Sequence, residues 1–344
     1  MAPSSEVSPR NYNYKPRNHN YAPVYVAGFG IAPAPPPLPP LSTKILARTG
    51  NRGGPHDQLQ SPLFGTLFPE LRNLIFIYAL TEYDDHTRRY RRHSHYYRPG
   101  FEYAKSIWTN LLLICRRVYL ETHLVPVSQN EHVFWMHQSP PYGKHASNYE
   151  TYFGQMSRLQ RGAVQSVRLF TQTSWLENKR APLEDAQVGR WPAGLVVPKL
   201  TITIRHSDWN YWESGHALRI EEPDNTKWGG WIGSVPGLQE LELELETLET
   251  KKDELEERVQ VARRWTFPLA NGACLVHDGA PPVQSVWLAT AALAPPGARR
   301  LLARNSRQIF DPGSEKGQDI VYPLDLKLHV KRLAFKLESV VLNK

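Results

Sequence analysis

The chain has 344 residues, 41% hydrophobic and 22% charged, a composition typical of folded globular proteins. Its net charge of +8 permits contact with nucleic acid or other acidic partners, and two cysteines are too few for a disulfide framework. No apolar run reaches the ~18 residues needed to cross a bilayer, and residues 1–21 contain no apolar stretch typical of a secretory signal. We therefore expect a protein of the cytoplasm or nucleus that does not enter a membrane.

Residues 1–58 are rich in Pro, Asn, Gly and Tyr, and include PAPPPLPP at 33–40. Proline fixes φ and lacks an N–H donor, so such a run favours polyproline II and does not build a core. We expect residues 1–58 to be a disordered tail. The alternative is a docking strand for a proline-recognition domain.

The stretch LFGTLFPELRNLIFIYAL at 63–80 predicts a helix that begins at Pro69, with Glu70 well placed at the positive end of its dipole. One apolar stripe at helical spacing consists of Leu71, Leu74, Ile75, Tyr78 and Ala79. Three further apolar residues lie off this stripe, namely Phe76, Ile77 and Leu80. One face can pack on the core, so the other needs a second neighbour, either in this chain or in a partner.

Residues 81–103 form a basic insertion. Five arginines alternate with tyrosines there: Arg88, Arg89, Arg91, Arg92 and Arg98 with Tyr90, Tyr96 and Tyr97. Arginines and aromatics together are typical of a nucleic-acid-binding loop, because they contact phosphates and stack on bases. The candidate residues for such contacts are Arg88, Arg89, Tyr90, Arg91 and Arg92. The alternative is a solvated loop between two helices.

The segment IWTNLLLICRRVYLET at 107–122 predicts a second helix. Its apolar stripe consists of Ile107, Leu111, Ile114, Cys115, Val118 and Tyr119. We expect Cys115 to be a small buried hydrophobe rather than a reactive thiol. A short strand is expected in NEHVFWM at 130–136.

The second half predicts a mixed sheet backed by helices. Short strands are expected at 164–170, 198–206, 238–246, 273–277, 285–289 and 321–337. In LQELELELE at 238–246, leucine alternates with glutamate, which predicts one buried and one solvated face. The following acidic stretch predicts an amphipathic helix with Leu248, Leu255, Val259 and Ala262 on its apolar side. The leucine spacing is weakly similar to a leucine-rich repeat, but no regular period of ~20–29 residues supports a solenoid.

Signals for catalysis or metal binding are few. The sequence has no GxSxG, P-loop, GxGxxG or CxxC motif, and its histidine-rich loop is also rich in arginine, which disfavours a metal cation. We therefore expect no metal, cofactor or catalytic site. A remote alternative is an enzyme of unrecognised type that uses His206, Asp208 and Glu213, which lie among aromatics in HSDWNYWES.

Two segments resemble the F-box-like module found in many fungal proteins of an uncharacterised family. In the first, Phe68-Pro69 correspond to a Leu-Pro pair, Glu70 to an acidic position, and Ile75 and Tyr78 to core positions. The second block is matched by Leu112, Cys115, Arg116, Tyr119 and Glu121. Further similarity extends over roughly residues 61–290. The resemblance implies that the first helices bind the adaptor of a cullin–RING ubiquitin ligase and that the C-terminal part captures a substrate.

These expectations give an α+β chain: a disordered tail at 1–58, an F-box-like helical module at 59–125 with a basic insertion at 81–103, and a mixed α/β region at 126–344 that continues the module. The expected function is a non-enzymatic interaction protein. Its candidate partner face consists of Leu67, Phe68, Pro69, Leu74, Ile75 and Tyr78. The alternative that the helices only build the core remains open, as does nucleic-acid binding by the basic insertion.

Overall fold

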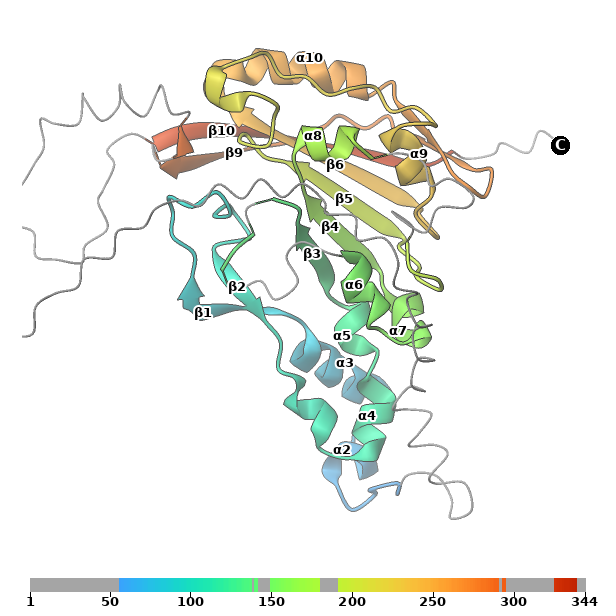
Figure 1. The fold of residues 1–344 in the computed structure, drawn as a ribbon. Helices are drawn as coiled ribbons and strands as arrows, with labels where there is room; N and C mark the ends of the chain where they lie inside the picture. Colours follow the sequence, from blue (N-terminus) through green and yellow to red (C-terminus); the bar gives the residue numbers. More distant parts are fainter. Residues whose placement is uncertain are drawn as a thin grey trace, which may run out of the picture. The chain divides into compact units, whose positions relative to one another are not determined.

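The computed structural model describes residues 56–137, 139–141, 149–179, 191–290, 293–294 and 325–338. These residues form a mixed α+β fold, with an eight-stranded mixed sheet, a separate two-stranded sheet and short helices (Figure 1). The predicted tail at 1–58 lies outside these residues except for its last three. Across the described ranges, we find no helix that is both long enough and apolar enough to cross a bilayer.

The large sheet begins with parallel strands in chain order. These four strands are β3 (Glu131–Trp135), β4 (Ser166–Phe170), β5 (Lys199–Ile204) and β6 (Glu240–Leu248). Antiparallel strands complete the sheet: β10 (Asp325–Leu337), β8 (Cys274–His277), β7 (Thr266–Pro268) and β9 (Val283–Thr290). The order is β3-β4-β5-β6-β10-β8-β7, with β9 also paired to β10. The strands predicted for this sheet are confirmed where the structure describes them, although residues 321–324 of the last one lie outside the described residues. Of the described strands of this sheet, only the short β7 was not predicted.

Helices cover one face of this sheet and enclose the main core. They are α6 (Tyr149–Gly154), α7 (Arg158–Ala163), α8 (Thr173–Glu177), α9 (Trp228–Gly233) and α10 (Lys252–Ala262). Leu241, Leu243 and Leu245 of β6 point into this core, together with Leu255, Val259 and Ala262 of α10, as their spacing predicted. The expectation that Leu248 lies on the helix is wrong, because it ends β6 and packs against a smaller cluster around Leu328. Glycine is required at Gly233, because an added Cβ would lie 2.2 Å from the carbonyl oxygen of Pro268.

The prediction that the glutamate face of β6 is solvated is wrong. Glu244 and Glu246 are 2% and 1% exposed, because the basic insertion lies over this face. Its Arg98 pairs with Glu244, and the ring of Phe101 packs against those of Trp135 and Phe170 at centroid distances of 5.9 and 5.0 Å. The burial of these acids therefore depends on a segment far away in the sequence.

The insertion itself is folded, so its interpretation as a solvated loop is also wrong. It begins as β1 (Tyr83–Arg89), which pairs antiparallel with β2 (Tyr103–Ser106). Between these strands, Tyr90, Tyr97 and Arg98 are buried. The segment between the two predicted helices is thus a hairpin whose connection packs on the sheet.

The N-terminal helices form a smaller cluster. They are α2 (Pro62–Gly65), α3 (Pro69–Leu80), the 3₁₀ helix η1 (Thr109–Leu113), α4 (Arg116–Thr122) and α5 (Val125–Ser128). Helix α3 begins at Pro69, as predicted. Phe64, Phe76 and Val118 form the centre of the cluster, and Cys115 packs against it. Asn130 connects the end of α3 to the sheet, because its side chain accepts from the N–H of Glu82 and donates to the carbonyl of Leu80.

The single helix predicted at 107–122 is interrupted at Cys115. This residue is extended, with φ −158° and ψ 165°, and its Sγ accepts a hydrogen bond from the N–H of Val118 at 3.5 Å, so it caps α4. The break turns Ile114 outward, whereas Val118 is buried as predicted. Cys115 is therefore a partly buried capping residue within the apolar cluster, rather than part of a continuous helical stripe.

Candidate interaction surface

The predicted apolar stripe of α3 faces solvent. We call the large exposed members of this stripe, together with the preceding Phe68, the α3 face. Their exposed fractions are Phe68 70%, Leu71 48%, Leu74 50%, Ile75 46% and Tyr78 80%. The inward side of α3 instead carries Arg72, Phe76 and Leu80. Ile77 is half-buried. The described part of the chain therefore does not cover both sides of this helix.

The buried side of α3 is held in place by a charged residue. Arg72 is 6% exposed, its Nε donates to the Glu121 carboxylate at 2.9 Å, and its guanidinium lies 5.1 Å from the Phe64 ring centre. A surface helix ordinarily buries aliphatic residues and exposes charged ones. Here the arginine is inside while large apolar side chains are outside. The orientation of α3 therefore leaves an apolar face without a neighbour among the described residues.

Further large apolar side chains are exposed on the neighbouring segment. Trp108, Leu113 and Ile114 flank or belong to η1, which contacts α3. Of the remaining candidates, Pro69 is exposed and Leu67 is half-buried. The sequence placed Ile114 in a buried stripe, and only the break at Cys115 explains its exposure. The sequence of this segment reads as one continuous amphipathic helix, and that pattern does not indicate that Trp108, Leu113 and Ile114 are exposed.

The residues proposed for nucleic-acid binding have different environments. Arg88 donates from Nε to Asp85 at 2.6 Å and from Nη2 to Ser106 at 2.8 Å. Tyr90 is buried, with its ring packed edge-on against that of Tyr96 at 5.1 Å. The remaining members of the set are exposed, namely Arg89, Arg91 and Arg92. Three cations are therefore accessible to a phosphate, whereas the Tyr90 ring is unavailable for base stacking.

The residues of the enzyme alternative have structural contacts. Asp208 accepts from the Arg205 guanidinium at 2.5 Å, and the ring nitrogens of His206 lie 3.2 Å from the Glu246 carboxylate and 3.0 Å from the carbonyl of Leu293. Both residues are buried, whereas Glu213 is exposed. No group of three or more His, Cys, Asp and Glu side chains in the described ranges is arranged to hold a metal ion. The three proposed residues do not line the cavity described next.

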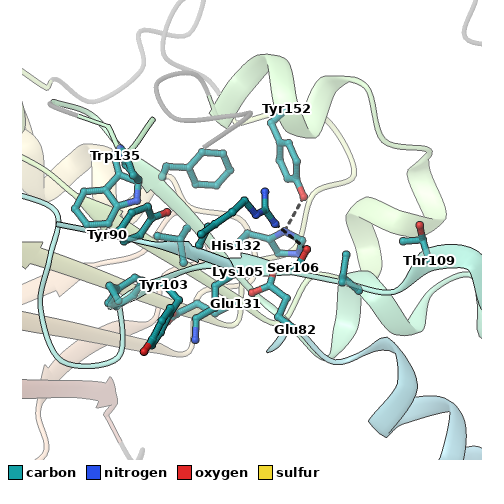
Figure 2. A pocket seen from close by; sticks show the side chains of 17 residues that line it. Glu82, Tyr90, Tyr103, Lys105, Ser106, Thr109, Glu131, His132, Trp135 and Tyr152 are labelled. Carbon is teal, nitrogen blue, oxygen red and sulfur yellow. Dashed lines mark hydrogen bonds between the residues drawn. The ribbon is translucent and has the colours of Figure 1, made fainter. Parts of the chain in front are cut away.

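A cavity of about 500 Å³ lies between the β1–β2 hairpin and β3 (Figure 2). His132 lies on its wall, with Nδ1 3.0 Å from the Tyr152 hydroxyl and Nε2 3.0 Å from the carbonyl of Val127. Burial lowers the pKa of His132, although the Val127 carbonyl opposes this. Burial also raises the pKa of Tyr152 to about 12. These two side chains are therefore neutral at pH 7 and position each other by hydrogen bonding.

The structure thus presents an exposed apolar helix face and a separate polar and aromatic cavity. No protein-family model, curated protein or solved structure matches this chain. The F-box-like resemblance therefore remains a hypothesis that depends on the motif residues and on the surface they form.

Proposed function

We propose that this protein is a non-enzymatic interaction protein of the F-box-like kind, and that its α3 face binds the adaptor of a cullin–RING ubiquitin ligase. The observation that carries the proposal is the exposure of large apolar side chains along α3, with Tyr78 at 80% and Phe68 at 70%. The identification of this adaptor as the partner depends on the resemblance of the two motif segments to the F-box-like module. The eight-stranded sheet region would then capture the substrate.

The α3 face has the composition of a binding hot spot. Aromatic side chains dominate the energetics of protein interfaces, and tyrosine is enriched among hot-spot residues. Each apolar side chain that becomes fully buried contributes about 1.5–3 kcal/mol. Phe68 and Tyr78 supply aromatic anchors, and Leu71, Leu74 and Ile75 supply aliphatic surface around them. The exposed Pro69 begins the helix, which holds these side chains in a fixed relative orientation.

We expect the double variant Ile75→Asp/Tyr78→Asp to lose at least about 100-fold in adaptor affinity, a loss of about 2.7 kcal/mol. Two charges would be placed within an apolar contact, whereas the buried residues Arg72, Phe76 and Leu80 would be unchanged. Binding of the purified full-length chain to the purified adaptor can be measured by isothermal titration calorimetry.

A suitable control is Leu159→Asp on α7, because Leu159 is 53% exposed and lies outside the α3 face. We expect this variant to bind the adaptor like the wild type. Both variants should retain the wild-type circular dichroism spectrum. Failure of the wild-type chain to bind the adaptor, or equal affinity of the double variant, would exclude the proposed function.

Nucleic-acid binding remains a second proposal, supported by the exposure of Arg89, Arg91 and Arg92. Because Tyr90 is buried, such binding would use phosphate contacts and show no base preference. Under this alternative, replacing the three arginines with alanine should weaken binding to a single-stranded oligonucleotide and reduce the slope of log K against log salt by about 2. Fluorescence anisotropy at several salt concentrations measures both effects. An unchanged slope would contradict this alternative.

A further inference from the structure

Two strand edges line the cavity beside the hairpin. Within the described residues, β3 forms ladder hydrogen bonds only with β4, and β2 only with β1. All residues of β3 (Glu131–Trp135) and all residues of β2 (Tyr103–Ser106) line this cavity. An edge strand presents a row of backbone donors and acceptors that can pair with another chain. The cavity therefore has backbone hydrogen-bonding groups along two of its walls.

The ladder identifies the outward groups of β3. The N–H of Met136, directly after this strand, donates to the carbonyl of Phe170 in β4 at 2.8 Å. In an extended strand, the N–H and C=O of one residue point to the same side and successive residues alternate. The backbone groups of Glu131, Val133 and Trp135 therefore point away from β4. In the described residues, no backbone-to-backbone hydrogen bond from another segment reaches them.

The charges around the cavity favour a cationic occupant. On the hairpin wall, Arg88 pairs with Asp85 at 2.6 Å and Lys105 with Asp84 at 2.7 Å. Of the two cavity carboxylates, Glu131 accepts from Arg168 at 2.8 Å, whereas Glu82 forms no ion pair with any of the described residues. A lysine or arginine brought into the cavity would supply the missing partner of Glu82.

The environment of Glu82 is consistent with this role. Burial raises the pKa of its carboxyl, Lys105 opposes the shift, and the nearby Glu131 adds to it. A positive charge beside Glu82 would relieve this cost of ionisation. The residue as a whole remains accessible to solvent, so an incoming cation can reach it.

The remaining lining suits the other side chains of an extended peptide. Tyr103, Trp135 and Tyr152 contribute aromatic surface around the strand edge (Figure 2). Phe101 also lines the cavity. A chain paired along five residues of β3 would extend over about 16 Å. In this mode of recognition, main-chain hydrogen bonds supply affinity and pockets for alternate side chains supply specificity.

We propose that the cavity binds an extended segment of a partner protein, which pairs with the outer edge of β3 and places a lysine or arginine against Glu82. This inference is independent of what the α3 face binds. It assigns a second interaction site, made by β2, β3 and the start of the hairpin.

The test uses a displayed library of random heptapeptides selected on the full-length wild-type chain. Selected peptides should carry a basic residue and bind Val133→Pro at least about 10-fold more weakly, since proline removes an outward N–H from an edge strand while leaving the β4 ladder in place. Glu82→Lys should weaken them similarly by repulsion. The α3-face variant Ile75→Asp/Tyr78→Asp should bind them like the wild type.

Synthetic peptides provide a readout that does not depend on the folding of a variant. N-methylation of one set of alternate amides should abolish binding, whereas N-methylation of the other set should be tolerated. Amide chemical shifts of Glu131–Trp135 should change on titration. The proposal is overturned if no peptide is selected, if Val133→Pro and Glu82→Lys bind the selected peptides like the wild type, or if both N-methylated series bind equally. It is also overturned if the wild type is a dimer that Val133→Pro converts to a monomer, because the edge would then pair with a second copy.

Discussion

Replacing Arg98 with methionine is expected to lower the free energy of unfolding by about 1.5–3 kcal/mol, the range for a hydrogen bond to a charged group. Arg98 Nη2 lies 2.5 Å from Glu244 Oε1 and 3.6 Å from Glu246 Oε2, and all three side chains are buried. Methionine preserves much of the apolar stem, so the main loss is the positive charge between two carboxylates. Urea denaturation followed by circular dichroism measures the change.

The matched control is Arg91→Met in the same connection. Arg91 is exposed and carries the same side chain, so its replacement should change the free energy of unfolding by less than about 0.5 kcal/mol. Similar stabilities of the two variants would contradict our account of how the insertion is fixed to the sheet.

A double-mutant cycle separates the ion pair from simple loss of packing. Glu244 also has Arg332 Nη2 at 2.6 Å and Arg168 Nη1 at 3.6 Å, so it keeps two cations when Arg98 is removed. We expect the cycle of Arg98→Met with Glu244→Gln to show a coupling energy of about 0.5–3 kcal/mol. If the effects of the two substitutions on the free energy of unfolding are strictly additive, the Arg98–Glu244 contact has no coupling energy of its own.

The buried ion network also shows the limit of prediction from sequence. The alternation of leucine and glutamate in β6 predicted the strand and its leucine face, because side chains alternate with period two. The same pattern does not indicate whether the glutamate face contacts water or another segment of the chain. Arg98 is 146 residues from Glu244 in the chain, so only the tertiary fold determines this contact.

The helices likewise show one feature that the local sequence predicted and one that it did not. The start of α3 was predictable because proline is favoured at the first helical position. The break at Cys115 was missed because the apolar period continues through η1 into α4, while the extended backbone of Cys115 interrupts the helix. The sequence thus identified the residues of the α3 face but could not determine which of its two apolar sides is exposed.

The cavity could not be predicted from sequence, because β2 and β3 lie on its opposite walls while η1, α4 and α5 separate them in the chain. Neither strand contains a motif for a ligand. Glu82 and His132 became candidates only through their shared position at the cavity. Local patterns therefore predicted the residues of the α3 face better than those of the cavity.

Acidification from about pH 5 to about pH 2 is expected to remove stability that Glu246 contributes, on the order of 3 kcal/mol at about 1.4 kcal/mol per pKa unit. Burial of Glu246 alone would raise the pKa of its carboxyl, but Arg98 and His206 outweigh this effect and lower the pKa to about 2, from 4.5 in an unperturbed glutamate. A lowered pKa in the folded state means that the unfolded chain binds a proton first. The contribution is therefore complete above about pH 4.5 and disappears as the pH falls towards 2. Glu244, whose pKa is also lowered, adds in the same direction.

Glu246→Gln isolates the part due to this carboxyl. Glutamine cannot ionise, so the variant should be less stable than the wild type at pH 7, and the difference should shrink progressively below about pH 4.5. Glu249, a partly buried residue with a pKa lowered to about 2 by His329 and Lys252, titrates in both proteins and cancels from the comparison. Urea denaturation at a series of pH values between 7 and 2.5 gives the two curves. If they stay parallel throughout, Glu246 is not ionised against Arg98 and His206 in the folded protein, because only a carboxylate that gains a proton on unfolding makes the two curves converge.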